Sequence, residues 1–281
     1  MKTSSRRTRT RSRARLWAPG ATAGIAVAVL FLLAAPNALG ASPPKAVVLS
    51  APYKGTSTGY SNSWSATGCG TAKISTYPFF DPHNGLGGFS DRAASPVCKA
   101  NPVAPSGSAG SWFDTLVPVH VSQKSVTVVV VATVDALVRA ELSAGSCTSS
   151  SANYSCYLSS YAYMYSDVYL LDLTTGSVWY PSTYWPGVFD SAYNETFCYA
   201  GNCSSYSSPS MSTTVSATHA WSIHATALNP ADRFAIEVYV SGDVYTELAA
   251  YGAVLHGADT SASVNLATMG NGFELDSITI V

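Results

Sequence analysis

The sequence RFAIEVYVSGDVYTELAAY, residues 233–251, decides the fold because apolar side chains recur at every second position. The even-numbered positions are apolar up to Ser241, and the same parity resumes after Asp243. Period-two alternation with one apolar face is typical of a β-strand that buries one side. Because Ser241-Gly242-Asp243 has the composition of a turn, we interpret the stretch as a hairpin with a three-residue loop in which Gly242 takes a positive φ.

The loop length fixes which residues of this hairpin face each other. A two-residue loop would pair core positions with solvent positions, whereas a three-residue loop matches the two faces. On the outer face it sets Tyr239 beside Tyr245 and Glu237 beside Glu247. Like charges directly opposite each other cost up to about 1 kcal/mol, so the two glutamates either splay into water or share a proton. Glu237 and Glu247 are therefore candidate catalytic residues.

The first forty residues resemble an export signal in composition. Seven basic residues precede an apolar run over residues 21–35, and a small-x-small cleavage site ends at Gly40. Fifteen apolar residues are fewer than the roughly 20 that span a bilayer. We predict a secretory signal peptide over residues 1–40, with an uncleaved membrane anchor as the alternative, followed by a single secreted domain over residues 41–281.

Removing this segment changes the charge balance. The chain has 15 Lys and Arg and 16 Asp and Glu, and seven of the basic residues but none of the acidic ones precede Gly40. The remaining chain therefore has 8 basic and 16 acidic residues, a net charge of −8. So acidic a domain offers no basic surface, and we expect no nucleic-acid partner and no membrane contact beyond an N-terminal anchor.

All six cysteines lie in the exported part, at positions 69, 98, 147, 156, 198 and 203. An even number of cysteines in an oxidising compartment indicates disulfide bonds, and short loops close most readily. We predict the bonds Cys69–Cys98, Cys147–Cys156 and Cys198–Cys203, and with them an extracellular or cell-surface location. The histidines and cysteines are not spaced as zinc ligands, so we expect no metal and no cofactor.

The other segments with clear patterns also read as strands. Residues 125–132 are nearly all valine, which is typical of a strand buried on both faces. We favour a strand over a helix for its continuation, residues 135–144. The apolar parity of the last strand changes near Asp276-Ser277, which predicts a β-bulge. By contrast, Gly, Ser, Thr, Asn and Pro dominate residues 54–111, which we interpret as a loop-rich excursion.

The count of candidate strands is about nine to eleven, with no βαβ pattern. We predict an all-β fold, a two-sheet antiparallel β-sandwich that is jelly-roll-like and has long disulfide-pinned loops. The closing sequence GNGFELDSITI, residues 270–280, resembles the last strand of jelly-roll carbohydrate-binding modules. This resemblance covers eleven residues, implies the same type of sandwich and carries over no site residue.

Aromatic residues gather in residues 147–210, which hold eleven of the seventeen tyrosines. Rows of Tyr and Trp suit stacking against sugar rings or a protein partner, because each ring has an apolar body and a polar tip. The alternative is that a half-exposed β-face simply favours tyrosine. The candidate ligand-binding residues are Tyr161, Tyr163, Tyr165, Trp179, Trp185, Tyr239, Tyr245 and Tyr251.

Two further features have simple interpretations. Glycosylation sequons begin at Asn153, Asn194 and Asn202, and they would mark exposed loops if the host glycosylates. Alternation over residues 217–228 directs His219 inward, so we interpret it as a core histidine and not as a ligand.

Three functions fit these patterns. The favoured one is a secreted or cell-surface domain that binds a glycan or a cell-surface protein through its aromatic face. The second is a glycoside hydrolase that uses Glu237 and Glu247, since retaining glycosidases place two carboxyl groups roughly 5–5.5 Å apart; an acid protease is a variant of this idea. The third is a structural protein of the cell envelope. We favour binding over catalysis, because two glutamates that lie in water on an open face are the simpler interpretation of the pair.

Overall fold

The computed structural model describes residues 46–65, 71–96, 106–143, 146–185, 187–200, 202–256, 258–266 and 272–281. Residues Lys45–Val281 form one compact unit. The predicted signal peptide and the predicted Cys69–Cys98 bond lie outside the described residues. Within the described ranges all regular structure is β-strand, and no helix is long and apolar enough to cross a membrane.

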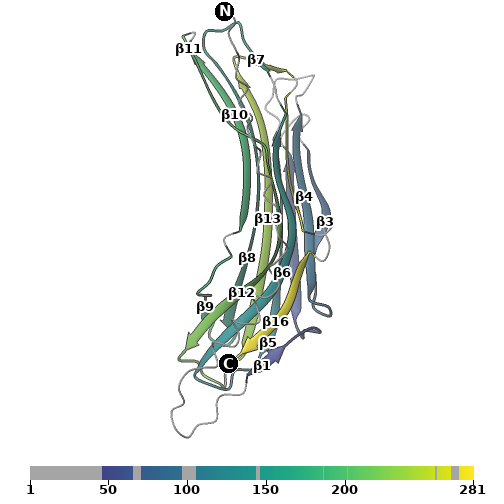
Figure 1. The fold of residues 1–281 in the computed structure, drawn as a ribbon, viewed down its shortest axis with the longest axis vertical. Helices are drawn as coiled ribbons and strands as arrows, with labels where there is room; N and C mark the ends of the chain where they lie inside the picture. Colours follow the sequence, from purple (N-terminus) through teal and green to yellow (C-terminus); the bar gives the residue numbers. More distant parts are fainter. Residues whose placement is uncertain are drawn as a thin grey trace, which may run out of the picture. The chain divides into compact units, whose positions relative to one another are not determined.

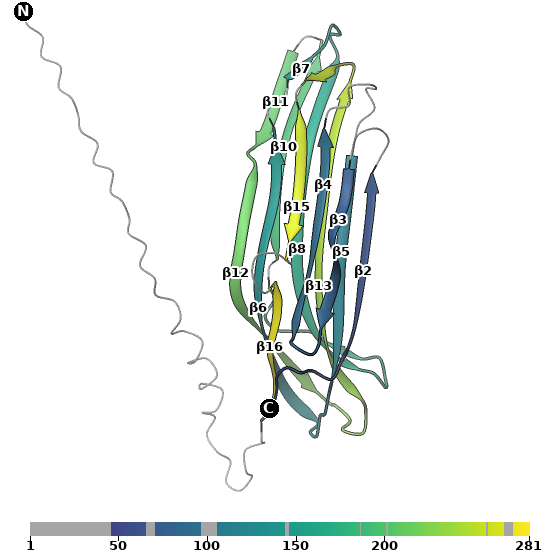
Figure 2. The same ribbon diagram turned by 90° about the vertical axis from the view of Figure 1, so that its right-hand side faces the viewer.

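Two seven-stranded antiparallel sheets pack face to face, as Figures 1 and 2 show. Sheet A has the order β1-β16-β4-β15-β6-β12, with β3 beside β4. Its strands are β1 (Val47–Leu49), β3 (Thr71–Asp81), β4 (Leu86–Pro96), β6 (Ser125–Leu142), β12 (Met211–Thr226), β15 (Asp259–Asn265) and β16 (Phe273–Ile280). The strands β15 and β16 pair with different halves of the long strand β6, and Figure 2 shows them one above the other.

Sheet B has the order β11-β10-β8-β13-β5-β2, with β9 beside β8. Its strands are β2 (Thr56–Ser65), β5 (Ser106–Val119), β8 (Tyr154–Asp172), β9 (Val178–Trp179), β10 (Val188–Tyr199), β11 (Asn202–Ser208) and β13 (Phe234–Tyr251). A short pair, β7 (Ser146–Thr148) and β14 (Val254–His256), stands apart from both sheets. The predicted β-sandwich is confirmed, with sixteen strands in the described residues where nine to eleven were expected.

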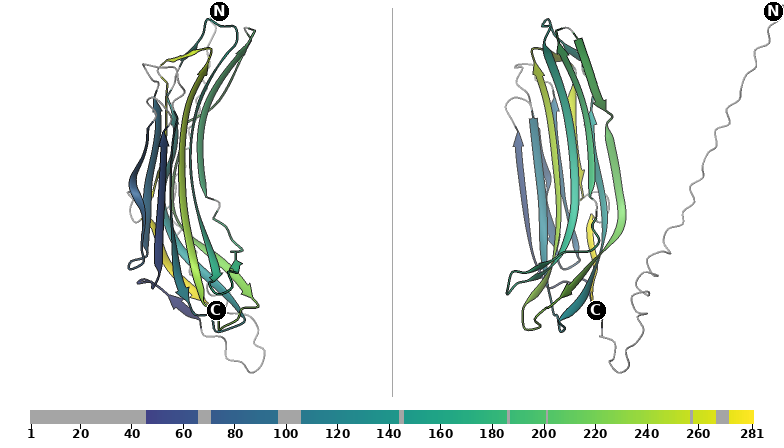
Figure 3. Two further views of the ribbon diagram at one scale, coloured as in Figure 1. Left: turned by 180° about the vertical axis from the view of Figure 1, so that it is seen from behind. Right: turned by 90° about the vertical axis from the view of Figure 1, so that its left-hand side faces the viewer.

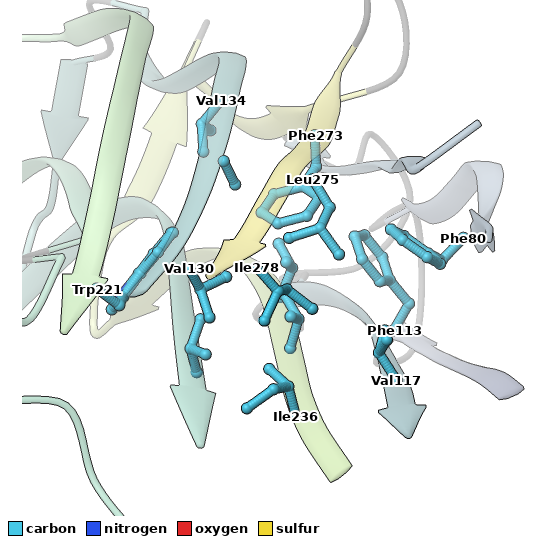
Figure 4. Close-up of a cluster of buried hydrophobic side chains, with 14 of the residues drawn as sticks. Phe80, Phe113, Val117, Val130, Val134, Trp221, Ile236, Phe273, Leu275 and Ile278 are labelled. Atoms are coloured by element: carbon cyan, nitrogen blue, oxygen red, sulfur yellow. The ribbon is translucent and has the colours of Figure 1, made fainter. Parts of the chain in front are cut away.

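The core fills the space between the two sheets. Phe113 of β5 is fully buried, and its ring centroid lies 5.9 Å from that of Phe80, 6.3 Å from that of Phe89 and 5.7 Å from that of Phe273. Figure 4 shows Phe113 with Phe80 and Phe273, and Val130 of the valine-rich strand β6 on the opposite side of the cluster. The apolar positions of both sheets therefore meet in one large cluster, and a smaller second cluster contains Cys156, Leu158, Leu248, Leu255 and Ala258.

Several sequence predictions are confirmed. The strand β6 continues to Leu142, so residues after 132 extend the strand and form no helix. The register between β16 and β6 shifts between Leu275 and Ser277, at the predicted bulge. The bonds Cys147–Cys156 and Cys198–Cys203 are present, with Cα atoms 6.1 and 4.1 Å apart. Two disulfide bonds are compatible with an oxidising, extracellular compartment.

The predicted hairpin at Ser241-Gly242-Asp243 is wrong. β13 is one strand of 18 residues, and it pairs without a break with β8. Gly242 is buried within it because the ring of Phe89 occupies the place where a side chain would be; a Cβ there would lie 2.8 Å from Phe89 Cζ. The prediction of which side chains of this stretch point inward is confirmed, because the even-numbered positions of β13 up to 248 are all buried.

The loop-rich interpretation of residues 54–111 is also wrong. This region supplies β2, β3, β4 and the first part of β5. Two of its glycines lie where backbones approach each other closely: a Cβ at Gly59 would come 2.6 Å from the carbonyl oxygen of Pro78, and one at Gly107 would come 2.7 Å from that of Thr71. Small residues therefore let β3 of sheet A lie against β2 and β5 of sheet B.

We expect Gly242→Ala to destabilise the protein by about 1–3 kcal/mol, because the added methyl group overpacks the core against Phe89 and Val264. Gly110→Ala is the matched control, since Gly110 lies opposite Asp243 on the neighbouring strand. Its Cβ would clash only with the carboxylate end of that side chain and would make an ordinary contact, at 3.7 Å, with the carbonyl oxygen of Gly242. Urea denaturation of both variants measures the difference. Equal stability of Gly242→Ala and the wild type would contradict the packing at this position.

Candidate functional site

Sheet B presents its outer face to solvent. Its strands bow along their length, so that this face is concave, and no described strand crosses its middle (Figures 1 and 3). On β8 and β13 the odd-numbered side chains point to this face, and on β5 the even-numbered ones do. The face is therefore built from every second residue of each strand.

Eight aromatic rings form a continuous row across this face, which we call the aromatic belt. In order of contact they are Tyr60, Trp112, Tyr239, Tyr165, Tyr163, Phe189, Tyr161 and Tyr245. Successive ring centroids lie between 5.3 Å, for Tyr161 and Tyr245, and 6.3 Å, for Tyr163 and Phe189. These separations fall in the range of favourable aromatic pairs. The rings come from β2, β5, β13, β8 and β10, and so link five neighbouring strands.

The register of sheet B produces this belt. Tyr60 lies directly opposite Trp112, and Tyr245 lies directly opposite Tyr161. Cross-strand pairs of this kind bring side chains of the same face into contact. The belt therefore depends on pairings between segments that are far apart in sequence.

A hollow of about 560 Å³ opens within the belt. It forms where β5 carries only small residues, so that no large side chain fills the space beside the rings. The residues lining it are Asn62, Ser108, Ala109, Gly110, Tyr161, Tyr163, Phe189, Asp243 and Val244. The carboxylate of Asp243 extends over Gly110, where a Cβ would overlap its Oδ1 atom.

The outer face of sheet B has an acidic character. None of its seven strands contains a Lys, Arg or His. Six carboxylates point outward from it, namely those of Asp114, Asp167, Glu195, Glu237, Asp243 and Glu247. Burial raises the pKa of Asp243, and burial together with the charge of Asp114 raises that of Glu237. The sheet itself supplies no positive partner for these groups.

Tyrosine hydroxyls bind some of these carboxylates. The hydroxyl of Tyr245 donates a hydrogen bond to Glu247 Oε2 at 2.9 Å, and that of Tyr169 donates one to Asp167 Oδ2 at 2.9 Å. Burial and these hydrogen bonds raise the pKa of both tyrosines. The phenols therefore stay neutral and hold the carboxylates in fixed orientations.

Five of the eight predicted ligand-binding residues meet in the belt: Tyr161, Tyr163, Tyr165, Tyr239 and Tyr245. Tyr251 lies at the far end of β13, where a second hollow of about 340 Å³ is lined by Tyr251, Phe197 and Tyr199 among others. Trp179 and Trp185 lie elsewhere, because both pack against the hydrophobic core. Trp179 contacts Phe234, with ring centroids 6.4 Å apart.

Three members of the belt were not among the residues predicted from the sequence. Tyr60 belongs to the region interpreted as a loop, Trp112 directly follows that region, and Phe189 lies at the start of β10. Their period-two pattern, in Tyr60-x-Asn62-x-Trp64 and in Trp112-x-Asp114, is the signal that indicates strands with one outer face.

The two candidate catalytic glutamates are not neighbours. Glu237 lies opposite Leu116 and Tyr169, whereas Glu247 lies opposite Ser106 and Ser159. Ten residues of one strand separate them by about 33 Å at the usual rise. The carboxyl spacing that motivated the glycosidase hypothesis is therefore absent from this pair.

The remaining candidate residues lie outside the belt. Asn153 and Asn202 are exposed near the turn between β10 and β11, where Asn153 Oδ1 accepts a hydrogen bond from the amide of Ala200 at 2.8 Å; Asn194 is half-buried within β10. The ring of His219 packs on Trp221 with centroids 4.6 Å apart. Among the described residues no three His, Cys, Asp or Glu side chains are grouped to hold a metal ion.

The fold and this face define the chain as a two-sheet antiparallel β-sandwich with an aromatic and acidic concave surface. No protein-family model matches its sequence, and no curated protein matches it either.

Proposed function

We propose that the protein is a secreted or cell-surface domain that binds a carbohydrate on the concave face of sheet B. The observation that carries this proposal is the aromatic belt, a continuous row of eight rings on a solvent-facing sheet. Rows of this kind are unusual outside binding surfaces, because large exposed apolar patches promote association.

The chemistry of the belt suits sugar rings. A pyranose presents an apolar C–H face that packs on an aromatic ring, and hydroxyl groups that need hydrogen-bond partners at its edge. Tyr and Trp provide the apolar surface together with a polar tip. Asn62, Ser108 and Asp243 add polar groups in the hollow between the rings. The five strands of the belt span about 19 Å at a strand spacing of roughly 4.8 Å, which gives room for several sugar units in a row.

Trp112→Ala and Tyr161→Ala should each weaken binding to an oligosaccharide about tenfold, because each removes a ring that contacts two neighbours in the belt. Isothermal titration calorimetry of the purified protein against a panel of soluble oligosaccharides measures the affinity.

The matched control for this test is Tyr77→Ala. Tyr77 is 73 % exposed and lies on the outer side of sheet A, so its ring should not contact the ligand. Binding that survives both belt substitutions, or that falls equally in Tyr77→Ala, would reject the belt as the binding surface. Circular dichroism spectra of all three variants check that the sandwich is intact.

A further inference from the structure

Asp243 occupies an aromatic environment in the hollow of the belt. The rings of Tyr161, Tyr163 and Phe189 line the hollow together with its carboxylate. Tyr161 and Phe189 have centroids 6.1 Å apart, and Tyr163 and Phe189 have centroids 6.3 Å apart, so Phe189 bridges the two tyrosines. A carboxylate beside several aromatic rings suits an ammonium group, because the carboxylate and the π-electrons of the rings both attract a cation.

The described strands of sheet B provide no cation for this position. No strand of sheet B carries a Lys, Arg or His, and Asp243 pairs with Gly110 on one side and with Tyr163 on the other. Another acid, Asp91, lies in the core beneath this part of the sheet, and the charge of Asp243 contributes to raising its pKa. Asp243 is exposed, and with rings and other acids around it this carboxylate attracts a positive ligand.

A metal ion fits the hollow less well than an amine does. Calcium and magnesium require about six or more oxygen ligands, whereas the hollow has one carboxylate among its nine lining residues, three of which are aromatic. An organic ammonium group needs only one carboxylate, and its carbon neighbours pack on the rings.

We propose that the hollow binds the protonated amino group of an amino sugar, and that the ligand of the belt is a polysaccharide with free amino groups, such as a polymer of glucosamine. This proposal rests on the carbohydrate-binding function proposed above, since the belt supplies the stacking and Asp243 supplies the selection for charge. The six outward carboxylates of the face extend the attraction to the other units of a cationic chain.

The pH range of binding follows from the groups that face Asp243. The ligand amine must be protonated and Asp243 must be ionised, while Tyr161, Tyr163 and the buried Asp91 are the other titratable groups around it. Burial raises the pKa of Asp243, so binding should decline in acid as this carboxylate becomes protonated. It should also decline in alkali as the amine loses its proton.

The test compares a glucosamine oligomer with its N-acetylated counterpart, which has the same rings but no charge. For the wild type near neutral pH we expect the amine form to bind about tenfold more tightly, and the ratio to shrink as salt is added. Asp243→Asn should lower the ratio to about one. Gly110→Ala should lower it too, because the new Cβ displaces the carboxylate. The matched control Glu195→Gln removes a charge from the same face outside the hollow and should keep the ratio.

Each outcome discriminates between the two proposals. Equal affinity of the wild type for both oligomers, or an unchanged ratio in Asp243→Asn, overturns the amino-sugar proposal but leaves carbohydrate binding in place. Absence of binding to either oligomer and to the wider oligosaccharide panel overturns the carbohydrate function itself. Tight binding of polylysine through Asp243, with no preference for the glucosamine oligomer over it, overturns the assignment to a sugar.

Discussion

Phe113→Ala should lower the free energy of unfolding by about 3–5 kcal/mol. Phe113 is fully buried, and its ring contacts the rings of Phe80, Phe89 and Phe273. These three residues come from β3, β4 and β16, so truncation leaves a cavity that spans both sheets. Gly87 also packs on this ring: a Cβ there would lie 2.7 Å from Phe113 Cζ, which leaves little freedom for the neighbours to collapse into the space.

Urea denaturation measures this loss, and Phe79→Ala is the control. Phe79 is next to Phe80 in β3 but is 46 % exposed, so its truncation should cost less than about 1 kcal/mol. A similar loss in the two variants would mean that the packing between the sheets does not depend on Phe113. Since the m-value reports the surface exposed on unfolding, an unchanged m-value would show that the loss arises in the folded state.

The inward faces of the long strands could be predicted from the sequence. Alternation in β13 identifies its buried positions correctly, and the valine-rich run identifies β6. The connection between the two halves of β13 could not be predicted in the same way. A three-residue loop and an uninterrupted strand both leave Val240 and Val244 on the same face of the sheet. In addition, strands of 18 residues are much longer than the usual 3–10. Composition at Ser241-Gly242-Asp243 therefore favoured a turn.

The true role of Gly242 depends on a contact that the sequence does not show. Phe89, some 150 positions earlier, places its ring against this glycine. The strands within residues 54–111 were missed for the same reason. Gly59 and Gly107 lie against the backbone of β3, and the sequence does not show that contact. Glycine in a turn and glycine beneath a partner side chain look alike in one sequence, and only the tertiary contact separates them.

The candidate site was predictable in part. The tyrosines of β8 and β13 follow directly from period-two alternation, because each lies on the outer face of its own strand. Their assembly into one belt with Tyr60 and Trp112 requires the order β10-β8-β13-β5-β2, which no local pattern gives. The hollow likewise depends on the register that sets Gly110 opposite Asp243. Strand order and register are long-range properties, so a single sequence leaves them open.

The stability of the protein should decrease as the pH rises from about 4 to about 7, through the titration of Asp91. Asp91 is fully buried, its Oδ1 accepts a hydrogen bond from the Ser111 hydroxyl at 2.6 Å, and its buried Oδ2 has no hydrogen-bond partner among the described residues. Burial raises the pKa of Asp91 from 3.8 to about 7; the Ser111 bond opposes this shift and the charge of Asp243 adds to it. The folded state thus holds a proton that the unfolded chain releases near pH 4.

A group whose pKa is higher in the folded state stabilises the fold at low pH and loses this contribution as the pH rises toward the folded pKa. A shift of about 3 units corresponds to roughly 4 kcal/mol, because each unit is worth about 1.36 kcal/mol. Asp91→Asn keeps an acceptor for Ser111 and removes the titration. Its free energy of unfolding relative to the wild type should therefore rise by about 4 kcal/mol between pH 4 and pH 7.5, measured by urea denaturation at both values. The other carboxylates titrate in both proteins, so their contributions cancel in this difference. Parallel pH profiles of the two proteins would contradict the prediction, because they would show that Asp91 is already ionised in the folded protein under mildly acidic conditions.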